Sequence, residues 1–211
     1  MKTEFKVKIQ RSFFDNYKRD LHLHPEFIRF EDKDLKNEGF IFFKNSEIKD
    51  FRFGVNWFKF YFVFGREYQF YIRNHNDEVL KIHFNSYFGV KKRERLALYV
   101  SIMDSLWDLY FNNQVNDFMK EFDEGKAFSI GDVTINSEGV IFCVSKLIKQ
   151  EKKQIAWQDL RYRSFRTYFS IYSKENPRDI NRGYSYKEDW NTFVLNNVIK
   201  NILSNKNIDN D

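Results

Sequence analysis

The spacing of the apolar residues changes its period along this chain, and this pattern constrains the fold more than any other feature. In residues 4–9 (EFKVKI) apolar and charged residues alternate, which is typical of a half-buried β-strand. From Leu96 the apolar residues recur instead at helical spacing, a pattern that extends to Phe122 and ends at Gly125. Alternating segments then return, and a second helical stripe occupies residues 190–203. This order of strands, helix, strands and helix predicts an α+β protein.

Short alternating or aromatic-rich segments, bounded by turn signals, predict the strands of both halves. Gly65-Arg66 is predicted to separate two strands of the first half. Because most aromatic residues alternate with polar ones, we expect them to be buried, and Trp157 and Trp190 in particular to lie in the core. The predicted strands are residues 4–9, 21–30 with a turn inside, 40–43, 48–53, 57–64, 68–73, 79–84, 128–130, 133–135, 140–144, 155–157, 160–163, 168–173 and 184–186.

The two halves resemble each other at an offset of 112 residues, and the match continues into a later strand, where Ile48 falls on Leu160. A competing match at an offset of 100 is shorter and does not continue through the later strands. The repeat indicates that each half consists of strands followed by a closing helix. We therefore expect domains at residues 1–124 and 125–205, with a frayed tail at 206–211. The matched residues are Leu21, Leu23, Glu26, Ile28 and Phe30 with Val133, Ile135, Glu138, Val140 and Phe142.

Four segments of the second half are similar to segments of a known group of proteins. They are INSEGVIF (135–142), IAWQDL (155–160), TYFSIYSK (167–174) and DWNTFVL (189–195). These segments resemble uncharacterised bacterial proteins with pleckstrin-homology-like (PH-like) domains, directly over residues 126–204 and through the repeat over residues 21–122. The resemblance implies two tandem PH-like domains, each a bent antiparallel sheet or partly open barrel that a C-terminal helix caps. The group brings no established activity, so no functional residue is carried over, and the first half lacks a counterpart of Trp190-Asn191.

Composition narrows the class of protein further. Cys143 is the single cysteine and lies within the apolar run VIFCV, so we expect a buried side chain, no internal disulfide and a reducing compartment. The longest uninterrupted apolar runs have five residues, far fewer than the roughly 20 that span a bilayer. The N-terminal residues contain no apolar core of a signal peptide. We therefore expect a cytoplasmic protein without a transmembrane segment.

Positive charge is concentrated in the second half of the chain. The formal net charge is +5, and residues 146–187 contain 11 basic residues against four acidic ones. Such a region either attracts nucleic acid or phospholipid headgroups through a salt-sensitive field or is an ordinary solvated face. The candidate anion-binding residues are Lys149, Lys152, Lys153, Arg161, Arg163 and Arg166.

A second basic cluster opens the first long helix. Cations are unfavourable at a helix N-terminus, and a bound anion would reverse that balance. Alternatively, the lysines precede the helix and are solvated. The cluster comprises Lys91, Lys92, Arg93 and Arg95.

Catalytic and metal-binding patterns are weak. The chain contains no G-x-x-x-x-G-K-[ST], no H-E-x-x-H and no G-x-S-x-G. Asp34 with Glu47 and Lys49 fits the loose carboxylate and Glu-x-Lys pattern of metal-dependent nucleases. His22 and His24 share one strand face, either as a metal pair or simply as its polar side. We predict no catalytic residue, no bound metal and no cofactor.

These observations favour a non-enzymatic interaction module that binds a protein or peptide partner through exposed sheet edges or the groove beside a capping helix. The alternative is a module that binds an anionic surface, either nucleic acid or phospholipid headgroups, through residues 146–187. A metal-dependent nuclease is the third hypothesis.

Overall fold

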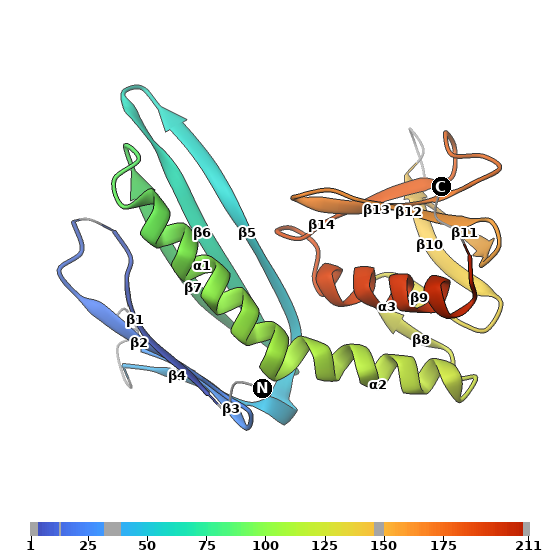
Figure 1. The fold of residues 1–211 in the computed structure, drawn as a ribbon, viewed down its shortest axis with the longest axis horizontal. Helices are drawn as coiled ribbons and strands as arrows, with labels where there is room; N and C mark the ends of the chain where they lie inside the picture. The colour runs from blue at the N-terminus through green and yellow to red at the C-terminus, as the bar shows by residue number, and fades with distance from the viewer. Residues whose placement is uncertain (1–3, 13, 32–38, 146–149, 209–211) are drawn as a thin grey trace. The chain divides into compact units, whose positions relative to one another are not determined.

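The computed structural model describes residues 4–12, 14–31, 39–145 and 150–208, and Figure 1 shows its helices and strands. The chain divides into two compact units, Met1–Asn112 and Asn113–Asp211. The predicted α+β class is confirmed: the described strands form four antiparallel sheets, two in each unit, and none of these sheets closes into a barrel. The division falls at the start of the helical segment that ends near residue 124, whereas the predicted boundary lies at its end.

Unit 1 contains a four-stranded sheet, a three-stranded sheet and a helix. Each strand pairs with its neighbour in the chain, so both sheets are meanders. The first sheet consists of β1 (Phe5–Gln10), β2 (Lys18–His24), β3 (Phe27–Phe30) and β4 (Ile41–Lys44). After a 3₁₀ turn (Asn45–Glu47), the second sheet consists of β5 (Ile48–Phe60), β6 (Val63–Asn74) and β7 (Val79–Tyr87), and α1 (Lys92–Leu106) and a π-helical turn (Trp107–Phe111) follow.

The helical segment of unit 1 packs on both sheets of its own unit. The Tyr99 ring lies 4.9 Å from the Phe70 ring, and the Phe111 ring lies 4.7 Å from that of Phe51, measured between centroids. On the other sheet, the Tyr110 hydroxyl donates to the carbonyl oxygen of His24 at 2.7 Å. These aromatic contacts close the core of unit 1.

Unit 2 repeats this order of elements. Trp157 lies in its core, as predicted: it is 1% exposed, its Nε1 donates to the carbonyl oxygen of Asn136 at 3.0 Å, and Phe122 contacts its ring edge to face. Trp190 is only half-buried. After α2 (Asn112–Asp123), the first sheet consists of β8 (Phe128–Ile130), β9 (Val133–Ile135), β10 (Gly139–Ser145) and β11 (Gln150–Ala156). The second sheet consists of β12 (Leu160–Ser164), β13 (Tyr168–Ser173) and β14 (Asn181–Ser185). The last helix, α3 (Thr192–Asn205), contacts β8 and β13.

The strand register also repeats between the two units. In unit 1, Leu23 of β2 pairs with Ile28 of β3. The residues 112 positions later, Ile135 of β9 and Val140 of β10, pair in the same way, and all four side chains are fully buried. The offset found in the sequence therefore relates equivalent core positions.

One turn of unit 1 differs from the prediction. Residues 57–64 do not form a strand that ends at Gly65-Arg66: β5 continues to Phe60, the chain reverses at Tyr61 and Phe62, and Gly65 lies within β6. Tyr61 has a left-handed backbone with φ of 50°, a conformation that two-residue hairpin turns commonly use. The prediction was wrong because an aromatic residue, not a glycine, occupies the reversal.

Candidate functional site

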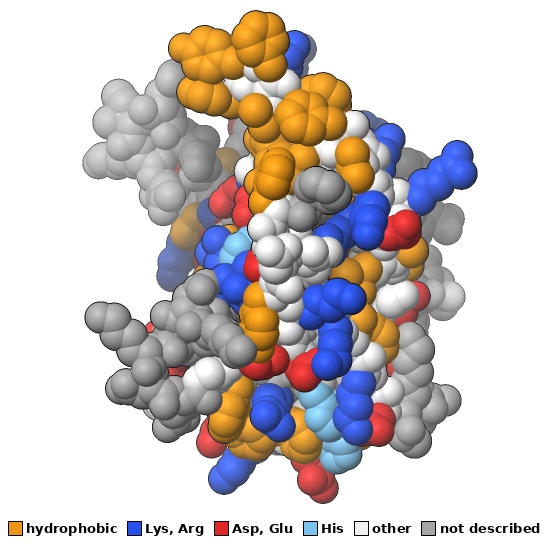
Figure 2. Space-filling view, turned by 90° about the vertical axis from the view of Figure 1, so that its left-hand side faces the viewer, with side chains coloured by type: hydrophobic (Ala, Val, Ile, Leu, Met, Phe, Trp, Pro, Cys, Tyr) orange, Lys and Arg blue, Asp and Glu red, His pale blue; other side chains and the backbone are white. Residues whose placement is uncertain are grey.

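A cluster of exposed aromatic residues covers the end of the β5–β6 hairpin. Figure 1 shows this hairpin extending beyond the start of α1, and Figure 2 shows hydrophobic side chains gathered over its end. A contiguous exposed apolar surface is characteristic of an interaction site. The residues, which we name the aromatic tip, are Trp57 (64% exposed), Phe60 (69%), Tyr61 (81%), Phe62 (92%) and Phe64 (50%).

The hairpin register places aromatic side chains on both faces of the tip. Trp57 pairs with Arg66, and Phe60 pairs with Val63. Because successive side chains of a strand point to opposite faces, these two pairs lie on opposite faces of the hairpin. The two residues of the reversal are aromatic as well, so the tip presents apolar surface on all sides.

Contacts with neighbouring side chains order three rings of the tip. The guanidinium carbon of Arg66 lies 3.7 Å from the centroid of the Trp57 ring, a cation–π contact. The rings of Phe60 and Tyr61 meet edge to face with centroids 4.6 Å apart. None of residues 56–66 is buried, so the aromatic tip does not contribute to the core of unit 1.

Between Trp57 and Phe60 of the tip, the Phe58 ring lies across Gly65 on the opposite strand. A Cβ atom at position 65 would be 2.5 Å from Cζ of Phe58 and closer still to the carbonyl oxygen of Ser86. Phe58 also contacts Tyr87 of β7 edge to face at 5.4 Å. A glycine at this position therefore lets the ring and β7 approach the hairpin together.

The aromatic tip belongs to an extension that unit 2 lacks. β5 and β6 have 13 and 12 residues, whereas β12 and β13, the corresponding hairpin, have 5 and 6. The two hairpins begin at equivalent positions, Ile48 and Leu160. The additional residues lie toward the reversal, where the exposed aromatic side chains are found.

Positive charge surrounds the base of the aromatic tip. Residues 56–66 and 85–93, which include the tip, the end of β7 and the start of α1, contain five cationic residues and no carboxylate. Two carboxylates directly follow these segments: Glu67 comes after Arg66, and Glu94 lies 4.0 Å from Nζ of Lys91. Figure 2 shows Lys and Arg side chains beside the hydrophobic cluster. The five, which we name the cationic collar, are Lys59, Arg66, Lys91, Lys92 and Arg93.

An open pocket of about 470 Å³ adjoins the tip. Trp57 and Phe64 line it from the hairpin, and Gly89 and Lys92 line it from the segment that leads into α1. The Phe88 ring lies 5.4 Å from the Phe64 ring and is itself half exposed. The pocket thus joins an apolar wall to one member of the cationic collar.

The basic cluster at the start of α1 does not act as one group. Lys91 precedes the helix in a left-handed conformation, and Lys92 and Arg93 are exposed. Arg95 is buried, and its Nη1 donates to the carbonyl oxygen of Gln10 at 2.7 Å. Arg95 therefore joins α1 to β1 and is turned away from any anion in solution.

Two of the predicted anion-binding residues of unit 2 are engaged elsewhere. Arg161 is buried, and its Nη1 donates to the carbonyl oxygens of Gln158 and Leu160, both at 2.8 Å. Lys153 pairs with Glu151 at 2.8 Å. These contacts leave less positive charge for a ligand than the count of residues indicates.

The remaining predicted residues of this region come from two sheets. Lys152 lies on β11 and Arg163 on β12, and these strands belong to different sheets of unit 2. Both side chains are exposed, as is that of Arg166, and Lys149 lies outside the described residues. An anion site formed by Lys152, Arg163 and Arg166 stays a prediction.

Two residues of the nuclease hypothesis, Glu47 and Lys49, contact other groups of the chain. Asp34 lies outside the described residues. The Glu47 carboxylate accepts a hydrogen bond from the backbone N–H of Lys44 at 3.0 Å, and Nζ of Lys49 lies 3.2 Å from Asp77. Within the described part of the chain, no three His, Cys, Asp or Glu side chains are grouped to hold a metal ion.

The two histidines of β2 pack into an aromatic cluster on the polar side of their strand. Nε2 of His22 lies 2.9 Å from the Glu4 carboxylate, and the His24 ring stacks on Phe27 at 4.8 Å. Hydrogen bonds from Lys6 and then from His22 lower the pKa of Glu4 below its ordinary value. This arrangement is that of a neutralised surface rather than a metal pair.

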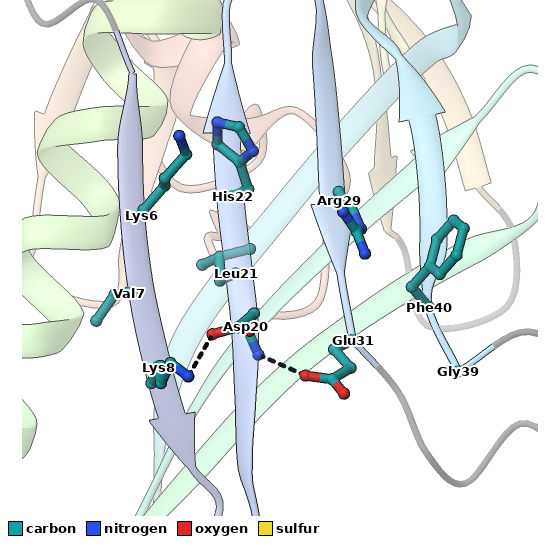
Figure 3. A pocket seen from close by; sticks show the side chains of 10 residues that line it. All are labelled: Lys6, Val7, Lys8, Asp20, Leu21, His22, Arg29, Glu31, Gly39 and Phe40. Atoms are coloured by element: carbon teal, nitrogen blue, oxygen red, sulfur yellow. Dashed lines mark hydrogen bonds and ion pairs between the residues drawn. The ribbon is translucent and has the colours of Figure 1, made fainter.

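A larger open groove of about 690 Å³ lies on the first sheet of unit 1 (Figure 3). Acidic and basic side chains lie close together in it: Nζ of Lys8 lies 3.7 Å from Asp20, and Glu31 accepts a hydrogen bond from the backbone N–H of Asp20 at 3.2 Å. Arg29 lies over the ring of Phe40, 4.7 Å from its centroid. Because acidic and basic groups alternate along this groove, it does not select a ligand of one charge.

Sequence reasoning missed the aromatic tip because it treated residues 57–64 as a buried strand. The sequence WFKFYFVFG contains one signal that could have found it: aromatic residues occur here without the polar alternation of the other strands. In the described residues, no helix is long and apolar enough to cross a bilayer. In comparisons with known proteins, no family model, curated protein or solved structure matches this chain.

Proposed function

We propose that this chain is a non-enzymatic binding module and that the aromatic tip is its contact surface. The observation that carries the proposal is the exposure of five aromatic side chains on a hairpin end that contributes nothing to the core. Burial of apolar surface against another molecule is favourable by about 25 cal/mol per Å². Most side chains of residues 57–64 are apolar, and the titratable groups among them are the Lys59 ammonium and the Tyr61 phenol. This composition suits binding more than acid–base catalysis.

The proposal includes the PH-like fold of both units. Its support is the order of elements: in each unit, antiparallel sheets of four and three strands are followed by a helix, in keeping with the arrangement that the resemblance implies. We propose that the two domains have the same fold. The longer β5–β6 hairpin gives unit 1 a contact surface that unit 2 lacks.

Photo-crosslinking in the native host tests the contact surface. A benzophenone amino acid replaces Phe62 in the full chain, and in a matched control it replaces Phe165, an exposed aromatic residue of unit 2. We expect adducts with a cellular molecule from position 62 only, and their loss when Phe60→Ser is added. Adducts of equal yield from both positions, or none from position 62, would refute the proposal.

A further inference from the structure

We propose that the aromatic tip binds the surface of a bilayer that contains anionic phospholipid. This inference rests on the proposed function of the tip. The aromatic side chains enter the interfacial region of the bilayer, and the cationic collar contacts the lipid phosphates. A protein partner and a second copy of the chain are the competing occupants, and the test below separates them.

The shape of the tip favours a lipid surface over a protein groove. Trp57 and Phe60 lie on opposite faces of the hairpin, and Phe62, at the reversal, is 92% exposed. A protein surface covers one face of such a projection, whereas lipid surrounds an inserted projection on every side. Aromatic side chains with a polar edge, such as Trp and Tyr, are enriched at the membrane interface.

The backbone of the tip is also suited to an apolar environment. The pairing of β5 with β6 continues to Phe60 and Val63, so only a two-residue reversal lies beyond the paired backbone. Unpaired backbone groups are costly in lipid, and a short reversal keeps their number small. No charged residue lies between Phe60 and Phe64, so shallow insertion of this segment buries no charge.

The charge around the tip matches an anionic surface. Lys59 and Arg66 lie on the hairpin itself, and Lys92 lines the pocket between Trp57 and Phe64. A basic residue close to an anionic bilayer contributes about 1 kcal/mol, and this contribution decreases with salt. Residues 56–66 and 85–93 contain five cationic residues and no carboxylate, and two carboxylates, Glu67 and Glu94, directly follow these segments, so positive charge exceeds negative charge around the tip.

Vesicle flotation with the full-length chain tests the proposal. The chain is mixed with vesicles of phosphatidylcholine alone, or of phosphatidylcholine with phosphatidylglycerol, at low and at high salt. We expect flotation with the anionic vesicles at low salt, and weaker flotation with neutral vesicles or at high salt. No flotation with anionic vesicles at low salt would overturn the proposal.

Two double variants separate the apolar and the charged contributions. Phe60→Ser with Phe62→Ser is expected to reduce the partition coefficient about tenfold or more, because two buried aromatic side chains are lost. Lys59→Gln with Lys92→Gln is expected to reduce it about tenfold or more on anionic vesicles and to leave binding to neutral vesicles unchanged. Circular dichroism and urea unfolding establish that each variant is folded.

Matched changes in unit 2 provide the control. Phe165→Ser with Lys174→Gln alters an exposed aromatic and an exposed basic residue and is expected to leave flotation unchanged. Loss of flotation in Lys152→Gln with Arg163→Gln, with none in the two variants of unit 1, would move the lipid site to the predicted basic region and overturn the proposal.

Photo-crosslinking and flotation together distinguish this inference from the function on which it rests. If the benzophenone at position 62 crosslinks only to protein and the chain does not float with vesicles, the lipid proposal is overturned and the tip is still a contact surface. A dimer that the Phe60→Ser and Phe62→Ser changes dissociate in sedimentation, again without vesicle binding, would assign the tip to a second copy. Absence of any adduct would remove the proposed function itself.

Discussion

Residues of one type have opposite roles in this chain according to their surroundings. Trp157 is 1% exposed and its indole N–H is satisfied by a carbonyl oxygen, whereas Trp57 is 64% exposed and carries only the guanidinium of Arg66 on its ring. The burial of Trp157 is typical of a core residue, whereas the exposure of Trp57 is typical of a residue at an interaction surface. Composition alone therefore says little about the role of the aromatic residues.

Tyr110 is a residue whose polar atom has a structural role. Its hydroxyl donates to the carbonyl oxygens of His24 at 2.7 Å and Phe27 at 3.0 Å, and burial raises the pKa of the phenol. Tyr110→Phe leaves these acceptors without their donor, so we expect the free energy of unfolding in urea to fall by about 1–2 kcal/mol. Tyr61→Phe, at an exposed hydroxyl, is the control and is expected to change nothing; an equal effect of both changes would contradict this account.

His83 makes stability depend on pH. Burial, and then the nearby cations Arg11 and Lys81, lower the pKa of His83 below its ordinary value of 6.5, while Glu67 acts in the opposite direction. As pH falls through about 6.5, the unfolded chain takes up the proton before the folded chain does, so the folded state loses stability below that pH. His83→Gln is expected to flatten the decrease in unfolding free energy between about pH 7 and pH 5. Identical pH profiles of the two proteins would refute this role.

At the scale of elements, the β5–β6 hairpin combines close packing against β7 with exposed aromatic side chains. Phe58 and Gly65 pair between Trp57 and the reversal, where the Phe58 ring fills the space over Gly65 and contacts Tyr87. None of residues 56–66 is buried. The contacts of Phe58 thus order the hairpin near its end while the aromatic tip stays exposed.

Gly65→Ala tests the packing of Phe58 against the opposite strand and β7. The added Cβ meets the Phe58 ring and the backbone of Ser86, so we expect the free energy of unfolding to fall by about 1–3 kcal/mol and amide exchange at the tip to accelerate. In Gly183→Ala the nearest atom is Cδ2 of Tyr168 at 3.6 Å, an ordinary contact. The control is therefore expected to be close to neutral, and equal losses in the two variants would show that space at Gly65 is not limiting.

The buried elements could be predicted from the sequence, and the exposed end could not. Leu23 lies between two histidines, and its pairing with Ile28 repeats 112 residues later. Period and offset together were therefore enough to place these strands. Residues 57–64 lack such alternation. The missing alternation is a sequence signal against a half-buried strand, but the aromatic composition is equally that of a buried one. The length of the hairpin in the structure shows that these residues project beyond the core.

At the scale of the whole molecule, the internal repeat supplies two similar scaffolds of which one carries an extension. The core positions of the two units correspond at an offset of 112 residues, but β5 and β6 are longer than β12 and β13. The core positions that both units share are those that each unit needs in order to fold. The aromatic tip is found in one unit only, is exposed and does not contribute to the core, and we propose binding as the reason for it.

Depth-dependent quenching measures whether the aromatic tip enters an anionic bilayer. In a Trp57→Phe background, a tryptophan is placed by Phe62→Trp or, as the control, by Phe165→Trp, and vesicles contain phosphatidylglycerol with brominated acyl chains. We expect the emission added by Phe62→Trp to be quenched and shifted to the blue, and the emission added by Phe165→Trp to be unaffected. Unquenched emission from position 62 in a chain that floats with these vesicles would show that the tip does not enter the bilayer.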